Sequence, residues 1–202
     1  MLLKNLHTSD VASDPLEQFK QWFSDAVESG NPEPEAMNLS TATNDGKPSS
    51  RMVLLKEVDR EGFVFFTNYE SRKGLEISEN PHAAVTFYWP ELARQIRIEG
   101  TVHKITAAES DSYFSGRPVA SQIGAVVSPQ SREIPDRQYL NNLTNTIGKE
   151  NDTSHIPRPA FWGGYRLIPL KIEFWQEQPN RLHDRILYRL ERNRWKIVRL
   201  AP

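Results

Sequence analysis

The chain of 202 residues contains no cysteine. This absence excludes disulfide bonds, thiolate nucleophiles, zinc–thiolate centres and cysteine-held iron–sulfur clusters. It also fits a reducing compartment. No apolar run is long enough to cross a membrane, and the first residues lack the basic and apolar regions of a secretory signal. We therefore expect a cytoplasmic protein that has no membrane partner.

An excess of charge of one sign is also missing. Lys and Arg together number 25 and Asp and Glu number 26, which gives a formal net charge of −1. No overall field attracts nucleic acid, so any anion site must be local. Arginines do gather near the C-terminus, but apolar residues alternate through 186–200, as in a half-buried hairpin. We expect no nucleic-acid partner.

Several common catalytic motifs are absent as well. The glycine patterns of dinucleotide-binding and P-loop folds do not occur, and neither does a nucleophile elbow. The histidines show no metal-ligand spacing, so we expect no metal site. They are His7, His82, His103, His155 and His183.

What the sequence does contain is a strand-rich pattern. Alternating segments between turn residues predict strands at 36–43, 49–58, 63–67, 83–89, 94–105, 161–168, 171–176, 185–191 and 195–200. Helices are predicted from Asp14-Pro15 to Gly30, after Ser71, at 107–115 and at 137–147. Loops are predicted at 116–136 and 148–159. This pattern indicates a mainly β fold with peripheral helices, in a barrel or a sandwich. We expect a single domain over 14–202, preceded by a flexible arm at 1–13.

The segment 174–185, FWQEQPNRLHDR, concentrates candidate ligand groups. Arg181, His183 and Arg185 alternate, so an extended chain would turn all three to one face and Leu182 and Asp184 away from it. Two guanidinium forks and an imidazole suit a planar anionic ligand. Taken alone, such a segment is more typical of a solvated strand surface.

Cationic and hydroxyl side chains also cluster at three other places in the sequence, in combinations that could bind phosphate groups. These groups are Arg51 with Lys56; Ser71 with Arg72 and Lys73; and Tyr113 with Arg117 and Ser121. At the helix predicted after Ser71, free backbone amides would add to the two cations. Gln95, Gln130 and Ser131 offer groups that can read a ring edge. Together the groups point to two phosphorylated ligands.

A series of longer motifs carries these groups in a fixed order. The motifs are RMVLLK (51–56), FFTNYESRKG (65–74), FYWPELARQIRIEG (87–100), SGRPVASQIGAVVSPQS (115–131), FWGGYR (161–166), FWQ (174–176), RLHDR (181–185) and the ending RLAP. With them the chain resembles the pyridoxine/pyridoxamine 5′-phosphate oxidase family over nearly all of 14–202. RLHDR is the most specific, because in that family it belongs to the substrate side. The resemblance implies an FMN-binding split β-barrel, antiparallel and Greek-key-like, and a homodimer with flavin sites between its subunits.

The resemblance also implies a role for each candidate residue. The FMN phosphate would be held by Arg51, Arg72 and Lys73, with Gln130 and Ser131 assisting from the partner subunit. The ribityl chain and ring region would be lined by Met52, Val53, Leu54, Leu55, Lys56, Phe66 and Thr67, and closed by Gln95, Trp175 and Arg185. The substrate phosphate would be bound by Lys56, Tyr113, Arg117 and Ser121, with Arg181, Leu182 and His183 over the substrate ring.

The implied reaction oxidises pyridoxine or pyridoxamine 5′-phosphate at the 4′ carbon to pyridoxal 5′-phosphate. FMN would take the hydride equivalent and O2 would be the final acceptor, giving H2O2, with NH3 released from the amine. The catalytic candidates are Arg181, which would orient the ring and stabilise charge, and His183, which would hydrogen-bond the ring hydroxyl. Residues 1–13 lack the arginine and tyrosine of the arm that covers the substrate in many family members.

Two alternatives share these motifs. Another FMN split-barrel oxidase or reductase, such as a phenazine-pathway type, would use the same flavin residues. The complete set of substrate-phosphate residues favours a vitamin B6 substrate over that alternative. A non-catalytic pyridoxal phosphate-binding protein would need the ligand residues without a working flavin site, whereas both sets are present.

Overall fold

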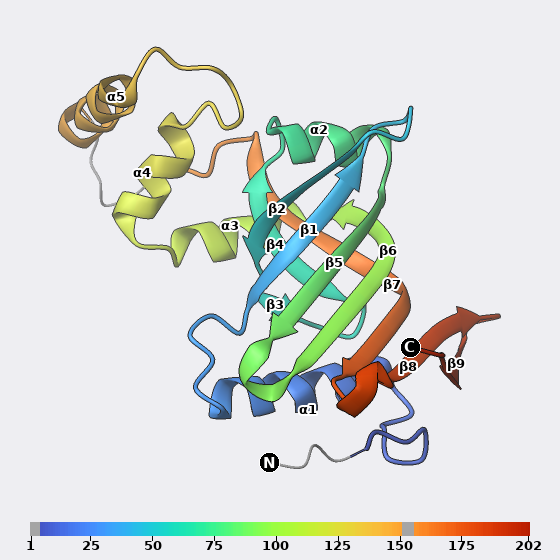
Figure 1. Ribbon diagram of the computed structural model, residues 1–202. Helices are drawn as coiled ribbons and strands as arrows, with labels where there is room; N and C mark the ends of the chain where they lie inside the picture. Colours follow the sequence, from blue (N-terminus) through green and yellow to red (C-terminus); the bar gives the residue numbers. More distant parts are fainter. Residues whose placement is uncertain (1–4, 151–155) are drawn as a thin grey trace.

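Nine antiparallel strands form one strongly curled sheet in the computed structural model, which describes residues 5–150 and 156–202 (Figure 1). The strand order is β2-β1-β5-β6-β7-β4-β3, with β8 paired to β7 and β9 paired to β8. The strands are β1 (Ala36–Ala42), β2 (Pro48–Leu54), β3 (Glu57–Val58), β4 (Phe63–Asn68), β5 (His82–Trp89), β6 (Arg94–Lys104), β7 (Trp162–Gln176), β8 (Asp184–Glu191) and β9 (Arg194–Arg199).

The helices lie around this sheet, so the prediction of a mainly β fold with peripheral helices is confirmed (Figure 1). They are α1 (Pro15–Glu28), α2 (Arg72–Glu79), α3 (Ala107–Ser115), α4 (Val119–Val127) and α5 (Arg137–Glu150), with short 3₁₀ turns at Pro90–Leu92 and Pro179–Arg181. Helices α4 and α5 extend away from the barrel (Figure 1). No helix in the described ranges is long and apolar enough to span a membrane.

Helix α1 covers one end of the curled sheet (Figure 1). Its start is confirmed, because the Asp14 side chain accepts from the amide of Leu16 at 2.8 Å and Pro15 takes the first helical position. Phe19 is fully buried and meets Phe63 and Phe87 edge-on, with centroids 4.8 and 5.1 Å away. The helix therefore seals the core and contributes no candidate site residue.

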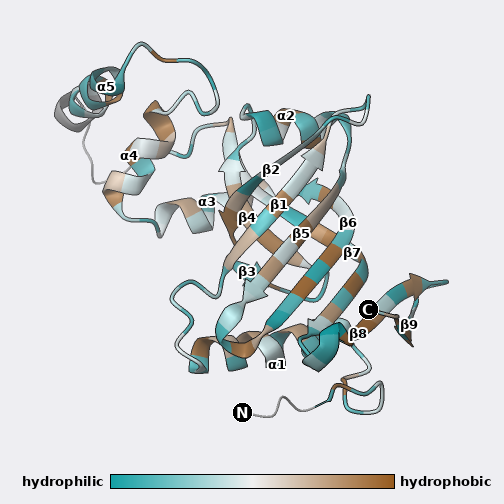
Figure 2. Cartoon of the chain, in the orientation of Figure 1, coloured by the Kyte–Doolittle hydropathy of each residue, from teal (hydrophilic) through white to brown (hydrophobic). Residues whose placement is uncertain are grey.

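The long pair β6 and β7 forms the spine of the sheet, and apolar and polar residues alternate along it (Figure 2). The register shifts between Glu99 and Gly100, where a β-carbon on Gly100 would overlap the carbonyl oxygen of Ile168. This bulge accommodates Pro169 inside β7. The two strands predicted at 161–168 and 171–176 are therefore one strand of 15 residues, and that prediction is wrong.

Three further predictions are wrong in detail. The strand predicted at 49–58 breaks at Leu55 and Lys56 into β2 and β3. The loop predicted at 116–136 contains helix α4. The loop predicted at 148–159 begins later, because α5 runs to Glu150, and residues 151–155 lie outside the described ranges.

Residues 5–13 contain no helix or strand but contact the end of the sheet. The amide of Leu6 donates to Asp184 at 3.0 Å, and the carbonyl of Ala12 accepts from the hydroxyl of Tyr188 at 2.6 Å. A flexible arm at 1–13 stays a prediction, as does a single domain over 14–202, and residues 1–4 lie outside the described part of the chain.

Candidate active site

A cavity of about 320 Å³ opens where β2, at one end of the strand order, approaches β4 beside α3. Every lining residue except Trp162 belongs to the predicted site. The lining residues are Arg51, Met52, Val53, Leu54, Lys56, Phe66, Thr67, Lys73, Tyr113, Arg117, Gln130 and Trp162. The structure thus brings together residues that lie up to 111 positions apart, which sequence spacing alone could not show.

One wall of the cavity is flat and aromatic. The rings of Phe66 and Tyr113 stack at a centroid distance of 3.7 Å and an angle of 10°, and Trp162 continues the stack 5.6 Å from Phe66. Burial raises the pKa of the Tyr113 hydroxyl, so this hydroxyl is neutral and able to donate. Such a wall offers planar contact and one polar group.

Arg117 lies against this wall with part of its hydrogen-bonding capacity unused. Its guanidinium stands 4.7 Å from the ring of Trp162, and its buried Nη1 has no partner among the described residues. Burial also lowers the pKa of Arg117, because desolvation disfavours the charged form. A buried donor without an acceptor is unfavourable, so an anion placed here would complete the site.

Lys73, like Lys56, is a cation of the cavity that forms no ion pair with the described residues. Its Nζ donates to Gln130 at 2.9 Å, and to Thr67 and Ser71 at 3.2 Å each. None of the described carboxylates forms an ion pair with it. Burial first, and then the nearby Arg51, lower its pKa to about 8. The hydrogen bonds of Lys73 go only to neutral groups, so its charge is available to a dianion bound in the cavity.

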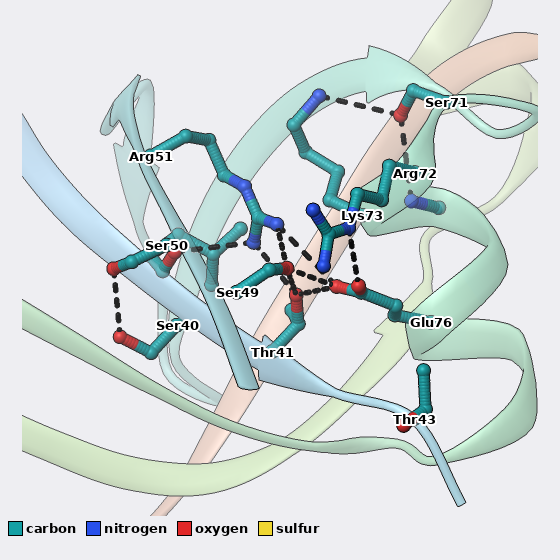
Figure 3. Close-up of polar contacts among 12 residues, drawn as sticks. Ser40, Thr41, Thr43, Ser49, Ser50, Arg51, Ser71, Arg72, Lys73 and Glu76 are labelled. Carbon is teal, nitrogen blue, oxygen red and sulfur yellow. Dashed lines mark hydrogen bonds and ion pairs between the residues drawn. The ribbon is translucent and has the colours of Figure 1, made fainter. Parts of the chain in front are cut away.

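Arg51 and Arg72 are instead held by a buried carboxylate, Glu76, that was not predicted (Figure 3). Glu76 is 4% exposed and lies one helical turn after Arg72, which donates to it at 2.9 Å. The i,i+4 spacing within the helix predicted after Ser71 was the available signal. The cation cluster therefore contains its own counter-charge.

A second group of predicted residues lies at the far end of β7. Trp175 pairs with Gln95 on one side and with Arg185 on the other. Arg185 forms a two-pronged ion pair with the buried Glu173, at 2.7 and 3.1 Å. The ring of His183 stands 4.7 Å from that of Trp175, and its Nδ1 accepts from the backbone N–H of Gln178 at 3.2 Å.

The predicted extended conformation of RLHDR is wrong at its start. Residues Pro179–Arg181 form a 3₁₀ turn, and β8 begins only at Asp184. Asn180 and Arg181 have φ values of 59° and 61°, in the left-handed region that residues other than glycine seldom adopt. Arg181 and Leu182 are exposed, so the three alternate side chains do not share a strand face.

Besides the residues at the far end of β7 and in RLHDR, four predicted residues stay outside the cavity lining. Leu55 is buried in the core. Arg72 points to Glu76, Ser121 lies on α4, and Ser131 is exposed. Gln130 reaches the cavity of its own chain, where it accepts from Lys73; the assistance from a partner subunit that the resemblance implies stays a prediction.

The two groups of residues are far apart within one chain. Trp162 begins β7 and Trp175 lies near its end, thirteen residues later. At about 3.3 Å per residue, a strand of that length spans roughly 40 Å. The bulge and the twist of the strand shorten this distance somewhat. One ligand of ordinary size cannot touch both groups of the same chain.

Comparisons with known proteins also treat the cavity and the far end of β7 as parts of two different regions. Residues 23–143 match the family described as "Pyridoxamine 5'-phosphate oxidase". The chain belongs to this family. Residues 162–202 match a second description, "Pyridoxine 5'-phosphate oxidase C-terminal dimerisation region", which supports a homodimer. The second group of residues lies within that region, apart from Gln95.

Curated members of the family match over nearly their whole length. The pyridoxine/pyridoxamine 5'-phosphate oxidase of Cupriavidus pinatubonensis is 54% identical over 202 residues, covering 100% of this chain and 95% of the relative. That of a Cyanothece species is 51% identical over 199 residues, covering 98% and 93%. These relatives support a pyridoxine/pyridoxamine 5'-phosphate oxidase-type oxidoreductase.

Two solved structures are similar over most of their length. PhzG from Burkholderia lata 383, solved with tetrahydrophenazine-1-carboxylic acid, has a TM-score of 0.92 at 34% identity and covers 100% of both chains. A pyridoxamine 5'-phosphate oxidase-related, FMN-binding protein from Nostoc punctiforme has a TM-score of 0.73 at 15% identity, covering 91% and 97%. The predicted split-barrel fold is confirmed.

Proposed function

We propose that this protein is an FMN-dependent oxidase that converts pyridoxine 5′-phosphate and pyridoxamine 5′-phosphate to pyridoxal 5′-phosphate. The observation that carries the proposal is that one cavity is lined by three cations, Lys56, Lys73 and Arg117, that form no ion pair with the described residues. Lys73 on one side, and Arg117 with Lys56 on the other, suit two phosphorylated ligands. Membership of the family supports the same reaction class.

The residues at the Lys73 side of the cavity fit FMN. Arg51, Lys73 and Gln130 would hold its phosphate, and Met52 to Leu54 with Thr67 would follow the ribityl chain. Arg72 would contribute charge from the edge of the cluster. Bound FMN would supply the redox chemistry, through which two electrons and two protons leave the substrate and reduce O2 to H2O2. With the amine substrate, water would hydrolyse the resulting imine and release NH3.

The residues at the Arg117 side would bind the substrate phosphate. Arg117 offers Nη1, which has no partner among the described residues, Lys56 adds a second cation, and Tyr113 offers a hydroxyl from the aromatic wall. Ser121 would contribute from the start of α4. Placing the phosphate here fixes one end of the substrate, so that the 4′ carbon can be held close to the flavin.

The second group of residues would complete the site from a partner subunit. Gln95, Trp175 and Arg185 are too far from the cavity of their own chain. The description of residues 162–202 as a dimerisation region supports contact with a partner subunit at this part of the fold. In this homodimer Trp175 and Arg185 of one subunit would close the flavin site of the other.

Arg181, Leu182 and His183 would cover the substrate ring. The exposed Arg181 sits at the end of a turn with two left-handed residues, a costly conformation of the kind found at functional sites. From there its guanidinium can lie over an electron-poor ring, orient it and stabilise developing charge. His183, packed against Trp175, can hydrogen-bond the ring hydroxyl.

A visible absorption spectrum tests the proposal. The purified protein should show a flavin spectrum that bleaches when pyridoxine 5′-phosphate is added without air. Admitting air should restore the spectrum and produce peroxide. A protein that binds no flavin, even after FMN is added, contradicts the assignment of Arg51 and Lys73.

The similarity to PhzG favours one alternative, an FMN enzyme that acts on a phenazine-type compound. Both candidates can offer an anion to Nη1 of Arg117, a phosphate in one and a carboxylate in the other, so the substrate itself must distinguish them. Faster turnover of a reduced phenazine carboxylate than of pyridoxine 5′-phosphate, in a substrate panel, would favour the alternative.

A further inference from the structure

Glu76 is buried at the centre of the cation cluster, although its charge has the same sign as that of the ligand proposed for the site. Figure 3 shows its carboxylate between Arg51 and Arg72, beside Thr41 and Ser49. The side chain is 5% exposed and comes from the second turn of α2. A buried carboxylate repels a nearby phosphate, so its presence needs a physical reason.

The hydrogen bonds around Glu76 give that reason. Burial opposes its ionisation, but hydrogen bonds from Ser49, Thr41 and Arg72 outweigh burial and lower its pKa to about 2. Glu76 is therefore an anion that only accepts. Thr41 and Ser49 must each give it their single hydroxyl hydrogen.

The direction of these bonds determines how Arg51 is held. Since their hydrogens go to Glu76, the hydroxyls of Thr41 and Ser49 can turn only lone pairs to Arg51. Arg51 also donates to the carbonyl oxygen of Leu39 at 3.2 Å and to Glu76 itself at 3.3 Å. All four N–H bonds of its two terminal nitrogens are then used, so Arg51 has its Nε–H and its charge to offer a phosphate. The guanidinium is fixed with no ligand present.

We propose that Glu76 is an internal counter-anion that keeps the empty phosphate site assembled and, by repulsion, weakens the binding of the flavin phosphate. The inference rests on the FMN site proposed above. Without Glu76, Arg51, Arg72 and Lys73 would stand together with no negative charge among them, and the empty protein would be destabilised by their repulsion. A bound phosphate dianion can take over that neutralising role.

The test compares Glu76→Gln with Glu79→Gln. Glu79 lies on the same helix, is exposed, and forms no ion pair with the described residues, so it controls for removal of one negative charge from α2. Each apoprotein is titrated with FMN and with riboflavin, which has no phosphate. Melting temperatures are measured with and without saturating FMN.

For Glu76→Gln we expect FMN to bind about tenfold more tightly than to the wild type, because one like charge near the phosphate is gone. Riboflavin affinity should be unchanged. The melting temperature should fall clearly for the apoprotein and less for the FMN complex. Glu79→Gln should match the wild type in all four measurements.

Weaker or unchanged FMN binding in Glu76→Gln overturns the proposal, since Glu76 would then position the arginines for the ligand. If the variant aggregates as apoprotein, it is refolded with FMN. A complex that melts near the wild-type complex supports the proposal, and failure to fold with FMN overturns it. A wild type that binds riboflavin as tightly as FMN instead refutes the phosphate site itself.

Discussion

Lys73 makes the affinity for FMN depend on pH. Burial and the neighbouring Arg51 lower its pKa to about 8, so the empty site loses this charge just above neutral pH. A bound phosphate dianion favours the protonated amine and raises that pKa. We therefore expect the affinity to be highest below about pH 8 and to fall as the pH rises through that value.

The magnitude follows from the fraction of empty protein in which Lys73 carries its proton. With a pKa of about 8, that fraction is about nine-tenths at pH 7 and about one-tenth at pH 9. The dissociation constant for FMN should therefore rise about tenfold between these two values, which is about 1.4 kcal/mol. Glu76, with a pKa of about 2, stays ionised throughout and adds nothing to the slope.

Fluorescence titration of the apoprotein with FMN, at about pH 7 and about pH 9, measures this change. Lys73→Arg is the matched variant, because a guanidinium keeps its charge over the whole range and should flatten the profile. Riboflavin controls for the rest of the site and should bind equally at both values. The reasoning is refuted if the dissociation constant of the wild type for FMN is the same at both pH values. It is also refuted if that of Lys73→Arg rises with pH as much as in the wild type.

Three further outcomes are expected from single substitutions. Arg117→Ala should raise the KM for pyridoxine 5′-phosphate at least about tenfold in steady-state assays while FMN titration stays unchanged, because it removes a charged donor to one phosphate only. Arg181→Ala should lower turnover sharply with FMN still bound; loss of FMN would contradict its assignment to the substrate. Phe19→Ala should lower the free energy of unfolding by about 3–5 kcal/mol in denaturant titration. Val27→Ala, on the exposed side of the same helix, should change it by less than about 0.5 kcal/mol.

The sequence correctly predicted those helices whose capping residues and apolar spacing lie within the helix itself. Helix α1 follows from an Asp-Pro start and an apolar stripe, and α3 was predicted with its observed bounds, 107–115. Helix α4 was missed because its sequence, VASQIGAVV, is rich in β-branched residues and contains a glycine, which are weak helix formers. Its neighbour α5 packs against it, and that contact is not visible in the sequence.

The sequence predicted which residues belong to the candidate site, but not how their side chains are placed. The order of the motifs identified most residues that line the cavity, from Arg51 to Gln130. It could not show that Leu55 turns into the core, or that Arg181 lies in a turn and not on a strand. Those outcomes depend on where β2 ends and how the chain enters β8, and both are set by packing across the sheet.

The hydrogen bond from the backbone of Gln178 to Nδ1 of His183 has a chemical consequence. A backbone N–H can only donate, so Nδ1 must be the bare nitrogen, and the neutral ring carries its proton on Nε2. The free edge of the ring therefore presents a donor and no lone pair. In this tautomer the free edge of His183 cannot remove a proton from a substrate, but it can donate a hydrogen bond to an oxygen on the substrate ring, and more strongly when that oxygen is ionised.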